Sequence, residues 1–166
     1  MSLELRPARV RDLDAIDAIY DHYVTQTPVT FDVEPAAPAA RHAWFEQFDA
    51  QGRHRLLVVE REGRVLGWAC SQPFRPKAAY ATSVETTIYL DRDATGQGLG
   101  SALYEALFTA LAEESVHRAY AGITLPNAAS EALHGRFGFQ PLGTFREVGF
   151  KLGRFWDVRW YEKRLG

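Results

Sequence analysis

Three glycines at alternate positions, Gly96, Gly98 and Gly100, stand at the start of a segment with a helical apolar face. Without Cβ atoms the backbone there can adopt unusual dihedral angles and let a ligand approach closely. The first N–H groups of a helix have no intrahelical acceptor, so together these features can bind an anion such as a pyrophosphate. The spacing differs from the dinucleotide fingerprint, and no Lys-Ser or Lys-Thr follows as in a P-loop. On these residues alone, an anion site and an ordinary strand-to-helix turn are both open.

The segments around this loop have the periodicities of a strand and a helix. Residues 84–90 alternate in polarity, are rich in β-branched side chains and contain one acidic residue, Glu85. Residues 99–111 repeat apolar side chains at the i, i+3, i+4, i+7 spacing of one helix face. We therefore expect a strand, a glycine-rich loop and a core-facing helix in succession.

The rest of the chain predicts an α/β arrangement in which helices pack on a mixed sheet. We expect further strands at 3–8, 55–60, 63–70, 117–124, 145–151 and 155–165, and helices at 13–23, at 39–48 and one ending at residue 136. The loop at 25–38 contains three prolines and has the length of a lid or binding loop. The predicted order of elements is β-α-α-β-β-β-α-β-α-β-β.

The composition is that of an ordinary globular protein. With 166 residues, 46% of them hydrophobic and 24% charged, the chain can bury a substantial core, and we expect residues 1–166 to form a single domain. The net charge of −2 gives no electrostatic footprint for nucleic acid or an anionic membrane. The N-terminus lacks the apolar core of a signal peptide and no apolar run is long enough to span a bilayer, so we expect a cytoplasmic protein.

Cysteine and histidine give no pattern for a metal site. The one cysteine, Cys70, excludes an intramolecular disulfide, and its apolar strand context predicts a buried, inert thiol. His42 and His54 are isolated among polar residues and are predicted to be surface residues, not metal ligands.

Several motifs together resemble the GNAT superfamily of N-acetyltransferases. They are the strand end Ile88-Tyr89-Leu90, the loop Thr95-Gly96-Gln97-Gly98-Leu99-Gly100, and the block that runs from Asn127 to Phe137-Gly138-Phe139. The resemblance covers nearly the whole chain. It implies a twisted, mostly antiparallel sheet of about seven strands flanked by about four helices, with acetyl-CoA as co-substrate and no metal.

A closer similarity, to the phosphinothricin and methionine sulfoximine N-acetyltransferases, is carried by residues 83–89, 125–127, 133–139 and 149–158. The last of these segments, Gly-Phe-Lys-x-Gly-x-x-x-Asp-Val, is the most specific. This similarity implies acetyl transfer to the α-amino group of a small amino acid with a second anionic or strongly polar group, by direct attack in a ternary complex. Similar proteins are usually homodimers, so we expect a homodimer, with the aromatic C-terminal hairpin either at its interface or in the core.

The resemblance also implies two catalytic residues. Glu85 is the expected general base, because an amine is mostly protonated at neutral pH and must lose a proton before it attacks. The alternative is a solvent-exposed strand glutamate. His134 occupies the position where many members have a general-acid tyrosine, and it would protonate the departing CoA thiolate or orient the thioester. The alternative is a surface histidine.

Binding residues follow from the same match. The residues expected to bind acetyl-CoA are Ile88, Tyr89, Leu90, Thr95, Gly96, Gln97, Gly98, Leu99, Gly100, Ser101, Asn127 and Ser130. Thr95 departs from the usual Gln or Arg, so one side-chain contact to the pyrophosphate is expected to be missing. The residues expected to bind the amino acid are Phe31, Arg75, Lys77 and Tyr80, although the segment at 73–80 could equally be a solvated loop.

Three alternative functions remain open at this level. The acceptor could be another amine, such as a different amino acid, a polyamine or a peptide N-terminus, because one fold hosts many substrates. The chain could be a non-catalytic acyl-CoA sensor, which would need neither Glu85 nor His134. A nucleotide-phosphate-binding module is the third alternative, and the absence of Lys-Ser or Lys-Thr after the glycines argues against it.

Overall fold

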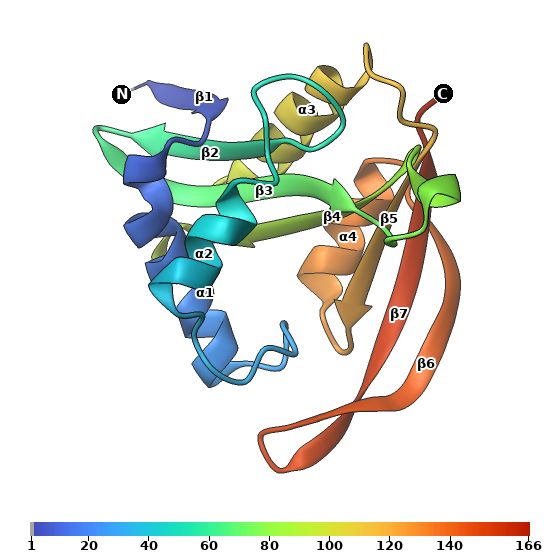
Figure 1. Ribbon diagram of the computed structural model, residues 1–166. Helices are drawn as coiled ribbons and strands as arrows, with labels where there is room; N and C mark the ends of the chain where they lie inside the picture. Colours follow the sequence, from blue (N-terminus) through green and yellow to red (C-terminus); the bar gives the residue numbers. More distant parts are fainter. Residues whose placement is uncertain (1) are drawn as a thin grey trace.

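The strands and helices assemble around a single twisted sheet in the computed structural model, which describes residues 2–166 (Figure 1). The strands are β1 (Leu3–Pro7), β2 (Leu56–Arg61), β3 (Arg64–Pro73), β4 (Ser83–Leu90), β5 (Arg118–Thr124), β6 (Gln140–Lys151) and β7 (Arg154–Arg164). The helices are α1 (Leu13–Gln26), α2 (Pro38–Phe45), α3 (Leu99–Leu111) and α4 (Ala128–Arg136). The predicted order of elements and the predicted fold class are confirmed.

The sheet has the strand order β1-β2-β3-β4-β5-β7-β6, and every neighbouring pair is antiparallel except β4 and β5. These two strands pair in parallel only over residues 83–85 of β4, opposite 118–120 of β5. Beyond that point β4 continues beside β3 to Leu90, and β5 continues beside β7 to Thr124. The sheet is therefore split between β4 and β5, and residues 86–90 have no strand on that side within the described chain.

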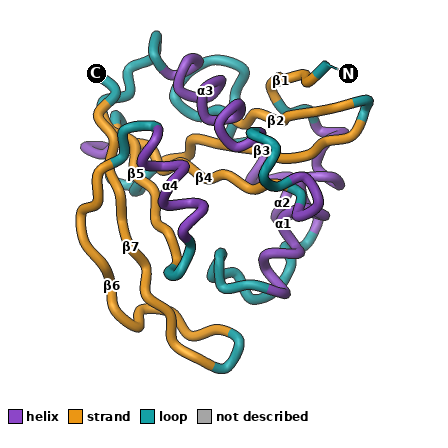
Figure 2. Tube along the Cα trace, turned by 180° about the vertical axis from the view of Figure 1, so that it is seen from behind, coloured by secondary structure: helices purple, strands orange, loops and turns teal. Residues whose placement is uncertain are grey.

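Helices cover both faces of the sheet, and each face has its own core. Helices α1 and α2 pack on one face around Ile16, Val58 and Trp68, whereas α3 packs on the other around Leu103, Leu107 and neighbouring strand residues. Leu133 and Phe137 place α4 beside α3. In Figure 1, α1 and α2 lie in front of the sheet. In Figure 2, which shows the molecule from behind, α3 and α4 lie in front. The apolar stripe predicted at 99–111 faces this second core.

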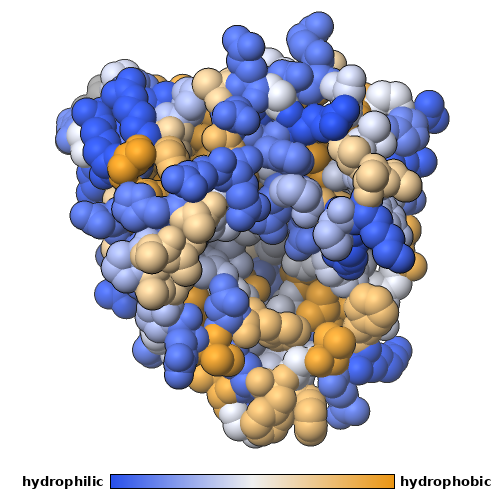
Figure 3. Space-filling model, viewed as in Figure 1, coloured by the Kyte–Doolittle hydropathy of each residue, from blue (hydrophilic) through white to orange (hydrophobic). Residues whose placement is uncertain are grey.

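Strands β6 and β7 form a long hairpin that extends beyond the rest of the sheet (Figures 1 and 2). Several of its apolar side chains are exposed: Phe145, Val148, Phe150, Leu152 and Phe155. Hydrophobic residues gather at the lower end of the molecule in Figure 3, where the hairpin lies in Figure 1. The end of the hairpin near its turn is thus outside the core, whereas Tyr161 of β7 belongs to the core around α3.

Several predicted boundaries differ from the structure. Helix α1 ends at Gln26 and not at residue 23, and strand β3 ends at Pro73 and not at residue 70. Two further differences have a clear physical reason. The helix expected at 39–48 ends at Phe45, because the next backbone bonds, from Gln47 to Trp44 and from Phe48 to Phe45, span three residues and belong to turns. The strand expected from residue 145 begins at Gln140. This edge strand is mostly exposed and its register shifts twice, so its sequence lacks a regular alternation.

Candidate active site

A cavity of about 600 Å³ opens where β4 and β5 separate. Figure 3 shows a hollow in this face of the molecule, above the exposed hairpin residues. Its lining includes Glu85, Thr86, Thr87, Ile88 and Tyr89 of β4, Ala121, Gly122, Ile123 and Thr124 of β5, Tyr104 of α3, Asn127, Ser130 and His134 at α4, and Arg41 and Trp44 of α2. Predicted catalytic residues and residues predicted to bind acetyl-CoA therefore meet in one cavity.

Glu85 enters the cavity from the face of the sheet that carries α1 and α2. Side chains alternate along a strand, and Tyr89, four residues on, belongs to the core on that face. Glu85 is half-buried and lies opposite Gln72 of β3. Burial raises the pKa of its carboxyl, and the positive charge of Arg75 opposes this shift. A half-buried carboxylate at a cavity wall differs from the solvent-exposed strand glutamate considered as an alternative.

His134 enters from the opposite face, on α4. It is 3% exposed, which rules out the surface alternative. Its Nδ1 lies 2.7 Å from the carbonyl oxygen of Ser130, and its Nε2 lies 2.8 Å from the hydroxyl of Tyr104. A carbonyl only accepts hydrogen bonds, so Nδ1 carries the proton in the neutral ring and the Tyr104 hydroxyl donates to Nε2. Burial lowers the pKa of His134, which favours this neutral form.

Tyr104 connects this pair to the central strand. Its ring is completely buried, and its hydroxyl lies 3.4 Å from Oγ1 of Thr86 on β4. Burial also raises the pKa of Tyr104. A chain of polar groups thus runs from Ser130 through His134 and Tyr104 to the edge of β4.

The glycine loop has the backbone that its sequence predicts. Gly96 and Gly98 have φ of +75° and +79°, a region that other residues rarely adopt, and Gly98 is the N-cap of α3. Glycine is favoured at position 100 for a different reason: a Cβ there would lie 3.3 Å from Cδ2 of Leu133 on α4. Thr95 donates its hydroxyl hydrogen to the Arg92 carbonyl, at 3.2 Å, and is exposed.

Asn127 has two structural roles. Its side chain caps α4 by accepting a hydrogen bond from the backbone N–H of Ser130, at 3.2 Å, and it also lines the cavity. Asn127 is therefore the N-cap of α4. This cap orients the helix that carries His134.

Phe31 lines the cavity, and the C-terminal hairpin holds its loop in place. The ring of Phe31 lies against Gly149, where a Cβ would come closer than 2.5 Å to the ring. Lys151 is 5% exposed, and its Nζ donates to the carbonyl oxygens of Thr30, at 2.7 Å, and Tyr23, at 3.3 Å. The glycine and lysine of the Gly-Phe-Lys motif thus fix the loop that supplies Phe31.

The other residues predicted to bind the amino acid lie outside the cavity lining. Arg75 stacks over Phe74, with 4.2 Å from its Cζ to the ring centroid, and its charge acts on Glu85. Lys77 and Tyr80 are exposed beside the short helical turn Ala78–Tyr80. Of these three, only Arg75 is tied to a cavity residue by charge.

Sequence reasoning missed many residues of the cavity lining, and Arg41 and Tyr104 are the two whose polar groups matter most to the site. Tyr104 follows Leu103 on the apolar side of α3. A tyrosine at such a position indicates a polar partner in the core, because a buried tyrosine hydroxyl needs a hydrogen-bond partner. Arg41 is a charged residue in a short helix, and nothing in the local pattern marks it as buried.

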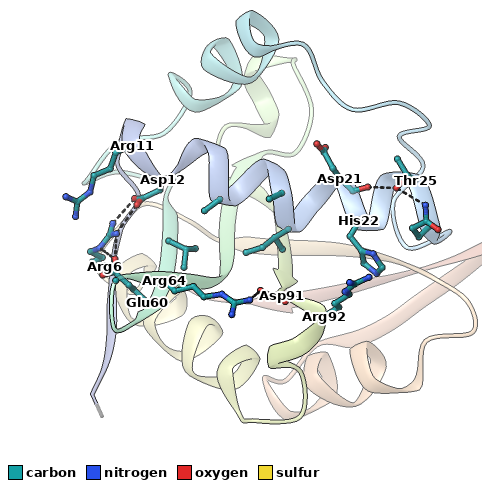
Figure 4. Close-up of a pocket in the computed structure, with 16 residues that line it drawn as sticks. Arg6, Arg11, Asp12, Asp21, His22, Thr25, Glu60, Arg64, Asp91 and Arg92 are labelled. Atoms are coloured by element: carbon teal, nitrogen blue, oxygen red, sulfur yellow. Dashed lines mark hydrogen bonds and ion pairs between the residues drawn. The ribbon is translucent and has the colours of Figure 1, made fainter.

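A larger hollow, of about 1030 Å³, lies between α1 and the β2–β3 turn. Figure 4 shows Arg6 between Asp12 and Glu60, and Arg64 beside Asp91. Glu85 and His134 do not line it, and its charges are largely paired with one another. The split in the sheet is therefore the better candidate site.

Within residues 2–166, no group of three or more His, Cys, Asp or Glu residues is arranged to hold a metal ion. None of the helices in this range is both long and apolar enough to cross a bilayer. Cys70 is buried, as expected, and burial raises the pKa of its thiol to about 12.

Comparison with known proteins identifies the family to which this fold and cavity belong. A model of the acetyltransferase (GNAT) family matches residues 16–139, most of the chain. The chain belongs to the GNAT acetyltransferase family. The predicted resemblance is confirmed, and the chain is an acetyl-CoA-dependent acyltransferase.

Relatives of this GNAT acetyltransferase are similar over their whole length. It is 52% identical to a phosphinothricin N-acetyltransferase of Streptomyces coelicolor, covering 98% of this chain and 96% of the relative. It is 36% identical to an L-methionine sulfoximine/L-methionine sulfone acetyltransferase of Pseudomonas aeruginosa, covering 99% and 96%. A solved GNAT superfamily phosphinothricin acetyltransferase from Sinorhizobium meliloti, in complex with AcCoA, superimposes with a TM-score of 0.93 at 32% identity, covering 100% of this chain and 90% of the other.

Proposed function

We propose that this GNAT acetyltransferase moves the acetyl group of acetyl-CoA to the α-amino group of a small amino acid such as phosphinothricin or methionine sulfoximine. The observation that carries this proposal is that Glu85 and His134 approach one cavity from opposite faces of β4, at the split in the sheet. The names of the similar proteins give the substrate class.

Acetyl-CoA would lie along the unpaired edge of β4 and supply an activated acetyl thioester. The pantetheine amides would pair with backbone groups near Ile88 and Leu90, as an added strand would. The N–H groups at Gly96, Gly98 and Gly100 would bind the pyrophosphate at the start of α3. Asn127 and Ser130 would contact the pantetheine arm where they line the cavity.

Glu85 would take a proton from the acceptor ammonium, directly or through one water. A raised pKa makes its carboxylate a stronger base than an exposed glutamate. The neutral amine then attacks the thioester carbonyl, which a backbone N–H near Ile88 polarises. The C–N bond forms, the C–S bond breaks, and the nitrogen loses its excess proton as the CoA thiolate gains one, so that the products are a neutral amide and the CoA thiol.

His134 would act through Tyr104. In its neutral form the Nε2 atom accepts a hydrogen bond, so the ring is placed to orient the Tyr104 hydroxyl and not to donate a proton itself. Protonation of the departing sulfur by Tyr104, on the α3 side of β4, would require its one O–H hydrogen to turn from Nε2 toward the sulfur. Orienting Tyr104 differs from both roles expected from the sequence, which were protonation of the CoA thiolate and orientation of the thioester.

Phe31 would form a wall of the acceptor site, held there by Gly149 and Lys151. Arg75 would attract the α-carboxylate of the acceptor to the end of the cavity where Glu85 lies, because its charge already acts on the Glu85 carboxyl. Lys77 and Tyr80 would contact the amino acid at the mouth of the cavity.

The test is thiol release from acetyl-CoA by the purified protein with a panel of acceptors. We expect turnover with phosphinothricin, methionine sulfoximine and methionine sulfone, and a much lower kcat/KM with polyamines, peptides and ordinary amino acids. Turnover confined to one of those other amines would replace the acceptor class. Acetyl-CoA binding without turnover of any amine would favour a non-catalytic acyl-CoA sensor.

We also propose that the protein forms a homodimer through the β6–β7 hairpin. The support is the row of exposed apolar side chains, among them Phe145, Phe150 and Phe155, on an element that extends away from the core. Clustered exposed apolar residues of this kind are typical of protein interfaces.

A further inference from the structure

Arg41 is a buried arginine in the wall of the acceptor cavity. It is 6% exposed, although it lies on the short surface helix α2. Its Nε forms an ion pair with Asp17 of α1, and its guanidinium lies over the ring of Trp44, at 4.6 Å, and near that of Tyr20, at 5.2 Å. These contacts fix the guanidinium plane at the cavity.

The buried guanidinium has more donors than protein partners. Asp17 is the one carboxylate paired with Arg41 within residues 2–166. It lies at the Nε edge but makes no hydrogen bond with Nε, and the two Nη groups have no hydrogen-bond partner in this part of the chain either, so the guanidinium is available to another acceptor. Trp68 lines the same cavity, is 2% exposed, and its Nε1 has no hydrogen-bond partner in the described chain. Buried donors without acceptors are costly, and they call for a ligand or water oxygen.

The strand register places Arg41 and Glu85 toward opposite ends of the acceptor side of the cavity. Gln72 lies opposite Glu85, Cys70 opposite Thr87, and Trp68 opposite Tyr89. Trp44 and Tyr20, the two rings that contact Arg41, both pack on Trp68. The charges of Glu85 and Arg41 both act on the Cys70 thiol between them.

This separation fits an amino acid with a polar group at the end of its side chain. A position two to four residues beyond Glu85 along the strand lies ~7 to ~13 Å from it. A chain of four single bonds between the α-nitrogen and a side-chain phosphorus or sulfur spans ~5 Å. A hydrogen bond of ~3 Å at each end brings the total to ~11 Å, within that range.

We propose that Arg41 binds the anionic or strongly polar side-chain group of the acceptor, with the indole N–H of Trp68 as a second donor. Asp17 is a positioning residue that holds the Nε edge and leaves the Nη edge for the ligand. Arginine suits this role because its planar fork matches the two oxygens of a phosphinate, carboxylate or sulfone. This inference rests on the proposed function and adds the residue that would select the side chain.

The test compares Arg41→Met and Arg41→Lys with wild type, using phosphinothricin and methionine sulfone as acceptors. Arg41→Met is expected to raise KM for phosphinothricin about 10- to 100-fold, because a hydrogen bond to a charged group is lost. KM for the uncharged sulfone should rise less, while kcat and the Kd for acetyl-CoA change little. Arg41→Lys keeps the charge without the fork and should fall between.

Arg55→Met is the matched control, because Arg55 is also a largely buried arginine paired with a carboxylate, Glu114, at 2.8 Å, but lies outside the cavity lining. Its KM values should equal those of wild type. Trp68→Phe, which keeps the ring and removes the N–H, carries the test if Arg41→Met does not fold, and should raise KM for both acceptors.

Unchanged KM for both acceptors in folded Arg41→Lys and Trp68→Phe would overturn the inference and leave the proposed function intact. Equal rises in KM for the anionic and the neutral acceptor in Arg41→Met would also overturn it, since packing alone would then explain the effect. If wild type acetylates neither acceptor, the proposed function fails and the inference fails with it.

Discussion

The buried histidine shows how one residue's environment limits its chemistry. His134 donates from Nδ1 to the Ser130 carbonyl, so in the neutral ring only Nε2 is left, and that atom accepts from Tyr104. A proton added to Nε2 would turn this acceptor into a donor that faces another donor. Burial lowers the pKa of His134 in agreement with this geometry.

Acid should therefore weaken the fold through His134. A folded-state pKa below the unfolded value of about 6.5 means that the unfolded chain binds more protons, so the free energy of unfolding falls as the pH drops below that value. His134→Gln should lose this part of the pH dependence, as measured by urea unfolding at neutral and mildly acidic pH. His42→Gln, at an exposed position, should keep it. An identical pH dependence in wild type and His134→Gln would contradict the neutral assignment.

Residues differ in how far the sequence could predict them. Glu85 and His134 stand in recognisable motifs, so both could be proposed before the structure, and both line the cavity. Arg41 and Tyr104 could not, because what matters in each is a contact with another element: Asp17 of α1 for Arg41, and His134 of α4 for Tyr104. Local periodicity carries no information about such contacts.

At the scale of elements, the glycine loop permits a direct test of the acetyl-CoA site. Gly98→Ala adds a Cβ at φ of +79° in the segment proposed to bind the pyrophosphate, which costs about 1–2 kcal/mol in backbone strain. We expect KM for acetyl-CoA to rise about tenfold or more, with kcat less affected, in steady-state thiol-release assays.

Gly52→Ala provides the control, because Gly52 also has a positive φ, +90°, with open space around its Cβ position, and lies away from the cavity lining. It should reduce stability similarly and leave KM unchanged. Equal effects of the two substitutions on KM would show that general destabilisation, and not the loop, controls acetyl-CoA binding.

The order of helices and strands could be read from the sequence because each has a clear period or boundary. The alternation at 84–90 and the apolar stripe at 99–111 are examples, and both are found where expected. The exposed edge strand β6 has no such period. Its shape depends on a bulge at which the backbone N–H of Glu147 donates to Asp157, at 2.7 Å, so its start could not be predicted locally.

Each defining residue of the hairpin motif has a structural role. Gly149 leaves room for the Phe31 ring, Lys151 anchors the loop of Thr30, Gly153 has a positive φ at the turn, and Asp157 accepts the bulge N–H. The motif that resembles a family signature in the sequence thus holds the loop that carries Thr30 and Phe31 in place.

At the scale of the whole molecule, the exposed hairpin predicts the assembly state. Phe150 and Phe155 pair across the hairpin with 5.0 Å between ring centroids, and they are 63% and 56% exposed. Replacing both with serine should convert the proposed homodimer into a monomer in sedimentation equilibrium. Val10→Ser, at an equally exposed apolar residue outside the hairpin, should leave the dimer intact. A monomeric wild type would contradict the proposal.

The two faces of the sheet bring different residues to the cavity. A split in the sheet lets Glu85 reach the site from the α1/α2 face and the His134–Tyr104 pair from the α3/α4 face. Acceptor and donor can then meet at β4 from opposite sides, so positioning is expected to supply much of the rate enhancement.

The most direct test is the rate of thiol release from saturating acetyl-CoA and phosphinothricin by wild type and Glu85→Gln, across the neutral and mildly acidic pH range. Glu85 must be deprotonated to act, and its pKa is raised, so wild-type kcat should fall as the pH drops through that pKa. Glu85→Gln should lose about 10²- to 10⁴-fold in kcat with an unchanged Kd for acetyl-CoA. A near-wild-type kcat for Glu85→Gln at every pH would remove Glu85 from the mechanism and contradict the account.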